Sequence, residues 1–169
     1  RCRSLVQITA RRERRLALPP RQSLALPVAY CEYALMNLLL VDTGPLVALA
    51  SKRDHAHDRC TEFLKTYRGR LLTTWAVLTE FSHLAPGVTA TLPLYKWIER
   101  GGLEIMTLGR DELVSAIDWI TRYADRPMDL ADASLVVAAL KTGCTNIWTL
   151  DRSDFETYRL PGRKHFKLA

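Results

Sequence analysis

The sequence lacks the hallmarks of membrane, secreted and zinc-binding proteins. Its longest apolar run, near residue 40, is interrupted by Asp42, Gly44 and Pro45, far short of the ~20 residues that a membrane span needs. Arginine and proline interrupt the N-terminal stretch, which therefore lacks the apolar core of a secretory signal. The four cysteines form no CxxC pair, and no histidine has zinc-site spacing. We therefore expect a reduced, cytoplasmic protein without membrane contact.

Excess charge of one sign is scarce outside the N-terminal segment. The chain of 169 residues has a formal net charge of +6. Seven arginines and two glutamates within residues 1–35 give +5, whereas 17 basic and 16 acidic residues in the other 134 give +1. The larger part of the chain is nearly neutral, so net charge offers no argument that this part binds nucleic acid.

The N-terminal segment also lacks a helical or strand period. The first methionine is Met36, directly before the first apolar run. We expect residues 1–35 to be a disordered or non-native basic segment, with Met36 as the natural start, and residues 36–169 to form one globular domain. A disordered arm that binds phosphates, or an arginine-rich transit peptide, remains an alternative for residues 1–35.

Short apolar runs alternate with stretches of helical spacing along residues 38–168. The predicted strands are 38–41, 71–73, 103–108, 146–150 and 165–168. Two helices are predicted to begin near Thr43 and Thr74, which serve as their N-caps. Further helices are predicted over 54–68, 90–100, 110–123, 130–141 and 154–158. This alternation predicts an α/β layer fold with a mainly parallel sheet.

Two of the predicted helices have informative patterns. The helix over 110–123 has Leu113, Val114, Ile117 and Ile120 on one face. The helix over 130–141 is apolar almost all round and ends at Gly143, which predicts that it is buried.

Four carboxylates lie in or beside apolar runs of four separate elements, namely Asp42, Glu80, Asp132 and Asp151. An ionised side chain there is costly unless something compensates its charge. Asp42 and Asp151 follow strands, and Glu80 and Asp132 lie in helices that start near the carboxyl ends of strands, where α/β proteins place their ligand sites. A divalent cation bound by oxygen ligands is the simplest shared compensator.

Each acid also has an ordinary structural interpretation. Asp42 and Asp151 fit turn positions, and Glu80 fits the solvated side of a helix. Asp129 shares a helix face with Asp132, but helix capping is as good an explanation for it as metal binding. Asp132 is hardest to explain this way, because its helix is otherwise apolar.

Four stretches carry a resemblance to a known family: LLVDTGPLVAL, TTWAVLTEF, PMDLADASLVVAALKTG and IWTLDRSDF. In this order they resemble the PIN-domain family, and specifically the VapC-type toxin ribonucleases of type II toxin–antitoxin systems. The resemblance covers Leu38 to Leu168 and implies a three-layer fold with a mainly parallel central sheet flanked by helices. It implies metal-binding roles for Asp42, Glu80, Asp132 and Asp151, with Asp129 as a further candidate, and supporting hydroxyls from Thr43 and Thr149. Gly44 departs from relatives that carry Asn or Ser there.

The resemblance further implies an endoribonuclease that hydrolyses RNA phosphodiester bonds with a Mg²⁺- or Mn²⁺-activated water. Such proteins form homodimers and are inhibited by a cognate antitoxin whose tail lies across the acidic groove. Local basic pairs such as Lys52-Arg53 or Arg122 with Arg126 are candidate RNA contacts.

The sequence also bears on three other functions. The main alternative is a non-catalytic PIN-like module that binds RNA or protein. A haloacid-dehalogenase-type phosphatase is disfavoured because Gly44 occupies the position of its second aspartate. A receiver domain is disfavoured because no lysine ends a predicted strand.

Overall fold

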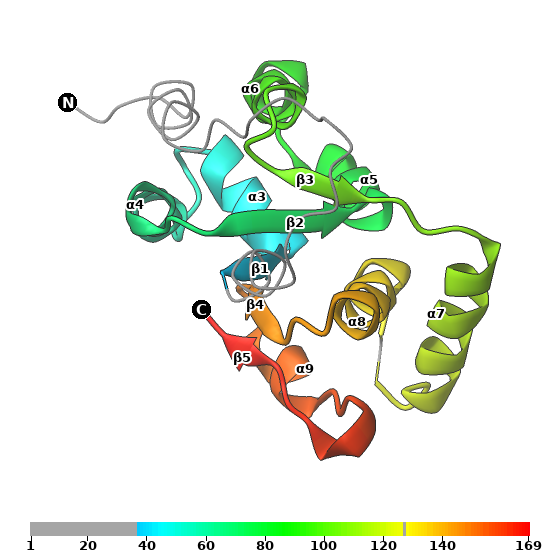
Figure 1. Ribbon diagram of the computed structural model, residues 1–169. Coiled ribbons are helices and arrows are strands. Elements are labelled where there is room, and N and C mark those ends of the chain that lie inside the picture. Colours follow the sequence, from blue (N-terminus) through cyan, green and yellow to red (C-terminus); the bar gives the residue numbers. More distant parts are fainter. Residues whose placement is uncertain (1–36, 127) are drawn as a thin grey trace, which may run out of the picture.

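The computed structural model describes residues 37–126 and 128–169, so the N-terminal segment discussed above lies outside the described residues. Within this part the chain forms a five-stranded sheet in the order β3-β2-β1-β4-β5 (Figure 1). All four strand pairs are parallel. The strands are β1 (Leu38–Val41), β2 (Arg70–Thr74), β3 (Glu104–Met106), β4 (Asn146–Trp148) and β5 (Lys167–Leu168). The predicted parallel α/β fold is confirmed.

Helices connect these strands. They are α3 (Thr43–Ala50), α4 (His57–Thr66), α5 (Trp75–Leu84), α6 (Val88–Glu99), α7 (Arg110–Arg122), α8 (Leu130–Thr142) and α9 (Arg152–Thr157), followed by the 3₁₀ turn η1 (Pro161–Arg163). The helices found in residues 37–126 and 128–169 are all too short or too polar to cross a membrane. Three predicted strands are longer than observed, since β3 and β4 each have three residues and β5 has two.

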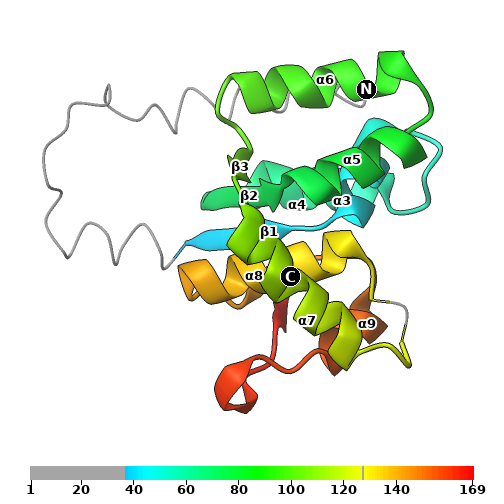
Figure 2. The same cartoon turned by 90° about the vertical axis from the view of Figure 1, so that its right-hand side faces the viewer.

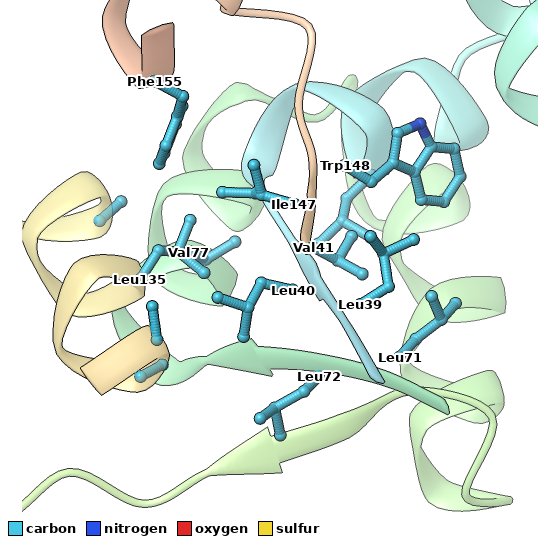
Figure 3. Close-up of a cluster of buried hydrophobic side chains, with 14 of the residues drawn as sticks. Leu39, Leu40, Val41, Leu71, Leu72, Val77, Leu135, Ile147, Trp148 and Phe155 are labelled. Atoms are coloured by element: carbon cyan, nitrogen blue, oxygen red, sulfur yellow. The ribbon is translucent and has the colours of Figure 1, made fainter. Parts of the chain in front are cut away.

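The core lies on both faces of the sheet, as expected for parallel strands. All four residues of β1 are buried. On one face Leu40 lies near Leu135 of α8 (Figure 3). On the other face Trp148 of β4 packs against Phe63 of α4, with ring centroids 4.5 Å apart. Helices therefore cover both faces, which gives the three layers that the resemblance implied.

Helix α8 is buried along nearly its whole length, as predicted. Asp129 caps its N-terminus, and Gly143 ends it in the left-handed conformation with φ of 70°. Between them, residues 133–139 are all buried. Asp132 thus lies in the first turn of a helix whose position is set by its packing against β1 and β2.

Helix α7 lies at the edge of the molecule and packs on the side of α8 that faces away from the sheet (Figures 1 and 2). Ala116 and Trp119 form its buried side. Of its predicted apolar face, Ile120 is half-buried against the core. The rest of that face is exposed, since Leu113, Val114 and Ile117 are 47%, 53% and 51% accessible. This part of the chain leaves that face uncovered.

Candidate active site

The predicted site forms where the order of strands reverses. The chain leaves β1 towards β2 on one side, while β4 pairs with the other side of β1. In parallel α/β sheets, ligands bind outside the carboxyl ends of the strands at such a point. Asp42 directly follows β1, and its backbone N–H donates to the carbonyl oxygen of Trp148 at 3.0 Å. The ends of β1 and β4 are thereby joined beneath the site.

A pocket of about 800 Å³ opens at this rim. All five predicted acids line it, together with two acids that were not predicted as site residues, Asp54 and Asp154. The lining includes seven carboxylates and one guanidinium: Asp42, Asp54, Glu80, Asp129, Asp132, Asp151, Asp154 and Arg152. The predicted clustering of these acids over one end of the sheet is therefore observed.

Asp42 is the most deeply buried of these acids, with 6% of its surface exposed. Its Oδ1 accepts the Thr43 backbone N–H at 2.7 Å, so Asp42 caps α3 and the prediction of Thr43 as the cap is wrong. Its Oδ2 accepts the Thr149 hydroxyl at 2.7 Å. Burial nevertheless raises the Asp42 pKa from 3.8 to about 6, and the nearby Glu80 adds to this.

Glu80 approaches the pocket from α5, whose N-terminus Thr74 caps as predicted. Glu80 is half-buried, and its Oε2 accepts the Thr43 hydroxyl at 2.5 Å. Thr43 therefore links two acids: its backbone N–H is bonded to Asp42 and its hydroxyl to Glu80. The hydroxyls of Thr43 and Thr149 thus lie beside the acids, where the resemblance placed them.

Asp129 and Asp132 reach the pocket from the start of α8. Asp129 is exposed, and its Oδ1 accepts the Asp132 backbone N–H at 2.9 Å, so its capping role is observed directly. Asp132 is half-buried, and its Oδ2 accepts the hydroxyl of Tyr158 at 2.8 Å. Burial raises the Asp132 pKa from 3.8 to about 7, and the negative charge of Asp129 contributes further.

Asp151 differs from the other predicted acids. It is exposed and lies three residues beyond β4, so the expectation that all four carboxylates are buried is wrong for Asp151. Its Oδ1 accepts the Ser153 hydroxyl at 3.0 Å and the Asp154 backbone N–H at 3.4 Å, and it thereby caps α9. The α9 residues lie in a short surface helix, where water can solvate Asp151.

The sequence gives a signal that Asp154 lies near Asp151, but it gives none for the other additional acid, Asp54. Asp154 lies three residues after Asp151, a helical spacing that places both on one side of α9. Asp54 lies in the connection between α3 and α4, where its Oδ1 accepts the Ala56 backbone N–H at 2.8 Å. Nothing in the local sequence distinguishes Asp54 from an ordinary loop acid.

The pocket suits a divalent cation in charge and donor chemistry. Carboxylate oxygens are the ligands that Mg²⁺ and Mn²⁺ prefer. Burial, and to a smaller degree the neighbouring carboxylates, raise the pKa values of Asp42 and Asp132, so a nearby cation would favour their charged forms. Within residues 37–126 and 128–169, no three His, Cys, Asp or Glu side chains are placed so that they could hold an ion as they stand. The acids therefore surround a shared space and do not form a closed coordination shell.

Comparison with known proteins shows the family to which this chain belongs. The chain is similar to Ribonuclease VapC26 of Mycobacterium tuberculosis, with 28% identity over 133 residues that cover 77% of this chain and 98% of the relative. Its fold is similar to the crystal structure of VapC20 of the same organism, a toxin that cleaves the Sarcin-Ricin loop, with a TM-score of 0.57 and 18% identity over 64% of this chain and 86% of VapC20. The model of the PIN domain matches residues 39–159, which contain all five predicted acids. The chain therefore belongs to the PIN domain family.

Proposed function

We propose that this protein is a Mg²⁺- or Mn²⁺-dependent endoribonuclease and the toxin of a toxin–antitoxin pair. The observation that carries the proposal is the meeting of Asp42, Glu80, Asp129, Asp132 and Asp151 in one pocket at the carboxyl rim of the sheet. The similarity to Ribonuclease VapC26 supports ribonuclease chemistry at that pocket.

The charge of the pocket supports a role for cations. Seven carboxylates face one guanidinium there, so an RNA phosphodiester meets strong repulsion in the metal-free protein. With a divalent cation held by these carboxylates, their charge would be offset and phosphate oxygens would be attracted to the pocket. Metal binding and substrate binding are therefore coupled in this proposal.

In this proposal some pocket residues bind the cation and others hold the carboxylates in place. Asp42, Glu80, Asp132 and Asp151 would hold the cation. Asp129, which is exposed at the edge of the pocket, is a further candidate ligand. When bound, Mg²⁺ or Mn²⁺ supplies an activated water and stabilises the charge that develops on the phosphodiester oxygens. The hydroxyls of Thr43 and Thr149 keep two of the carboxylates in place by donating to Glu80 and Asp42.

Basic side chains near the pocket are candidate contacts for the RNA backbone. Arg152 lines the pocket and is exposed. Lys52 and Arg53 are exposed and immediately precede Asp54, another lining residue. In this proposal these cationic groups at and near the edge of the pocket bind phosphates of the RNA backbone. The proposed RNA substrate agrees with the cytoplasmic location expected from the sequence.

The homodimer implied by the resemblance has a candidate surface on α7. Leu113, Val114 and Ile117 form an exposed apolar strip there, and such strips commonly mark protein interfaces. Asp111 lies in the first turn of α7 and Arg122 in the last. Two copies of α7 packed antiparallel across a twofold axis bring these opposite charges together.

A cognate antitoxin is the proposed inhibitor. Its tail would lie across the acidic pocket, and the seven carboxylates favour a segment that carries Arg or Lys. Such a segment would neutralise the pocket without a metal and would exclude RNA from it.

The test is cleavage of labelled cellular RNA by the full chain with Mg²⁺ or Mn²⁺ and with EDTA. Asp132→Asn removes a pocket carboxylate, and Asp58→Asn removes an exposed acid of α4 that does not line the pocket. We expect metal-dependent cleavage that Asp132→Asn abolishes and Asp58→Asn retains. Cleavage in EDTA, or by Asp132→Asn, would contradict the proposed site. A folded wild type that binds Mn²⁺ but cuts no RNA would favour the non-catalytic binding module.

A further inference from the structure

Three of the pocket acids each accept a hydrogen bond from the hydroxyl of a residue at least 26 positions away in the sequence. The donors are Thr149 to Asp42 at 2.7 Å, Thr43 to Glu80 at 2.5 Å and Tyr158 to Asp132 at 2.8 Å. The two threonines lie beside acids in the motifs that carry the family resemblance. Tyr158 lies outside them, at the C-terminal end of α9, and is 26 residues from Asp132 in the sequence.

We propose that Tyr158 is a positioning residue, whose hydroxyl orients the Asp132 carboxylate for the divalent cation. The inference rests on the proposed metal-dependent function and extends it to a residue beyond the acidic set. Its first support is the geometry of Asp132 itself. The torsion that rotates an aspartate carboxylate is broad and soft, so hydrogen-bond partners decide how its two oxygens point. The Tyr158 hydroxyl occupies one lone pair of Oδ2, so the other oxygen, Oδ1, has the greater capacity to act as a ligand.

The second support is that the start of α8 does not itself orient this carboxylate. The backbone N–H of Asp132 donates to Asp129, which is the cap of the helix. Asp42 differs, because the neighbouring N–H of Thr43 already fixes one of its oxygens. Asp132 therefore depends on a donor from a distant segment, and Tyr158 supplies it.

The third support is that Tyr158 is itself held firmly. Only 1% of its surface is exposed. Its ring packs edge-on against Phe155 and Tyr123, with centroids 5.3 Å and 5.2 Å away. The hydroxyl of Tyr123 in turn accepts the backbone N–H of Arg159, the residue after Tyr158, at 2.8 Å. A donor fixed on several sides can impose its geometry on the softer carboxylate.

A matched pair of variants separates positioning from packing. Tyr158→Phe removes the hydroxyl that donates to Asp132 and keeps the buried ring. Tyr95→Phe removes a tyrosine hydroxyl that bonds to Ser82, and neither Tyr95 nor Ser82 lines the pocket. The full chain would be titrated with Mn²⁺, with free Mn²⁺ measured by electron paramagnetic resonance, and its melting temperature would be measured without metal. Loss of a partner that orients a metal ligand typically weakens metal affinity by about 10–100-fold.

We expect Tyr158→Phe to weaken Mn²⁺ binding by at least about 10-fold, and Tyr95→Phe to leave it unchanged at a comparable melting temperature. A folded Tyr158→Phe variant that binds Mn²⁺ as tightly as the wild type would overturn the positioning role and leave the proposed nuclease intact. Equal weakening by both variants would also overturn it, because general loosening would explain the loss. A wild type that binds no Mn²⁺ would overturn both proposals.

Discussion

The hydroxyl of Thr149 donates a 2.7 Å hydrogen bond to Oδ2 of Asp42, a residue 107 positions earlier in the chain. Both residues are buried, and they follow adjacent strands β4 and β1. The bond therefore stabilises the charged form of the most buried pocket acid while it ties the two strand ends together. A single substitution at Thr149 can therefore measure what this hydroxyl group contributes to stability and to metal binding.

Replacing Thr149 with valine keeps its shape and removes this donor. We expect Thr149→Val to lower the free energy of unfolding by about 1–3 kcal/mol, because a buried carboxylate loses a partner. The Asp42 pKa should rise further, and Mn²⁺ binding at neutral pH should weaken in consequence. Urea denaturation and Mn²⁺ titration measure the two effects. Thr66→Val, at an exposed position of α4, is the matched control and should change neither.

The stability of the metal-free protein should fall as pH rises towards neutrality. The pKa of Asp42 is raised to about 6 and that of Asp132 to about 7. Between the ordinary value of 3.8 and these values the folded state binds more protons than the unfolded state, so a rise in pH favours unfolding. For Asp42 the full effect is on the order of 3 kcal/mol.

Melting temperatures in EDTA, measured from about pH 5 to about pH 8, test this sign. We expect the wild type to melt at lower temperature as pH rises, and Asp42→Asn to flatten the profile because the amide does not titrate. A wild-type melting temperature that rises across this range would show that folding does not raise the pKa values of these acids.

Charge placed on the exposed face of α7 should separate the proposed homodimer. Ile117→Asp buries a carboxylate in the interface if two copies pack through this face, at a cost far above that of an exposed acid. Light scattering after gel filtration should show a dimer for the wild type and a monomer for Ile117→Asp. Leu92→Asp, at an exposed apolar position of α6, should remain dimeric. A wild-type monomer, or dissociation by Leu92→Asp alone, would exclude α7 as the interface.

The structure offers a reason for glycine at position 44, where the resemblance leads one to expect Asn or Ser. A Cβ atom at Gly44 would lie 3.1 Å from Cβ of Leu150, closer than ordinary packing allows. We expect Gly44→Ser to destabilise the protein by about 1 kcal/mol through overpacking. The loss should be smaller in a Leu150→Ala background, because alanine keeps the Leu150 Cβ but removes Cγ, which would lie 3.3 Å from the new Cβ atom. Chemical denaturation measures both losses, and an equal loss in both backgrounds would mean that the Leu150 side chain beyond Cβ is not the cause.

The sequence by itself determined the order of elements and the rim at which the acids gather. Apolar runs such as Leu38–Val41 have the character of buried parallel strands, and an acid directly after such a strand, Asp42, falls at its carboxyl end. The helix with Asp132 is apolar almost all round, so its burial was also predictable. These conclusions depend on local periodicity and on chain direction, which a sequence carries.

Only the tertiary structure decided which groups meet across the pocket and which surfaces stay open. The partner of Asp132 is Tyr158, the solvation of Asp151 follows from its place in the short α9, and the apolar face of α7 lacks a cover in the described part of the chain. Periodicity shows that a helix has an apolar face, but not which segment covers it. Hydrogen-bond partners separated by 26 or 107 residues are set by the packing of whole elements, and no local pattern encodes that distance.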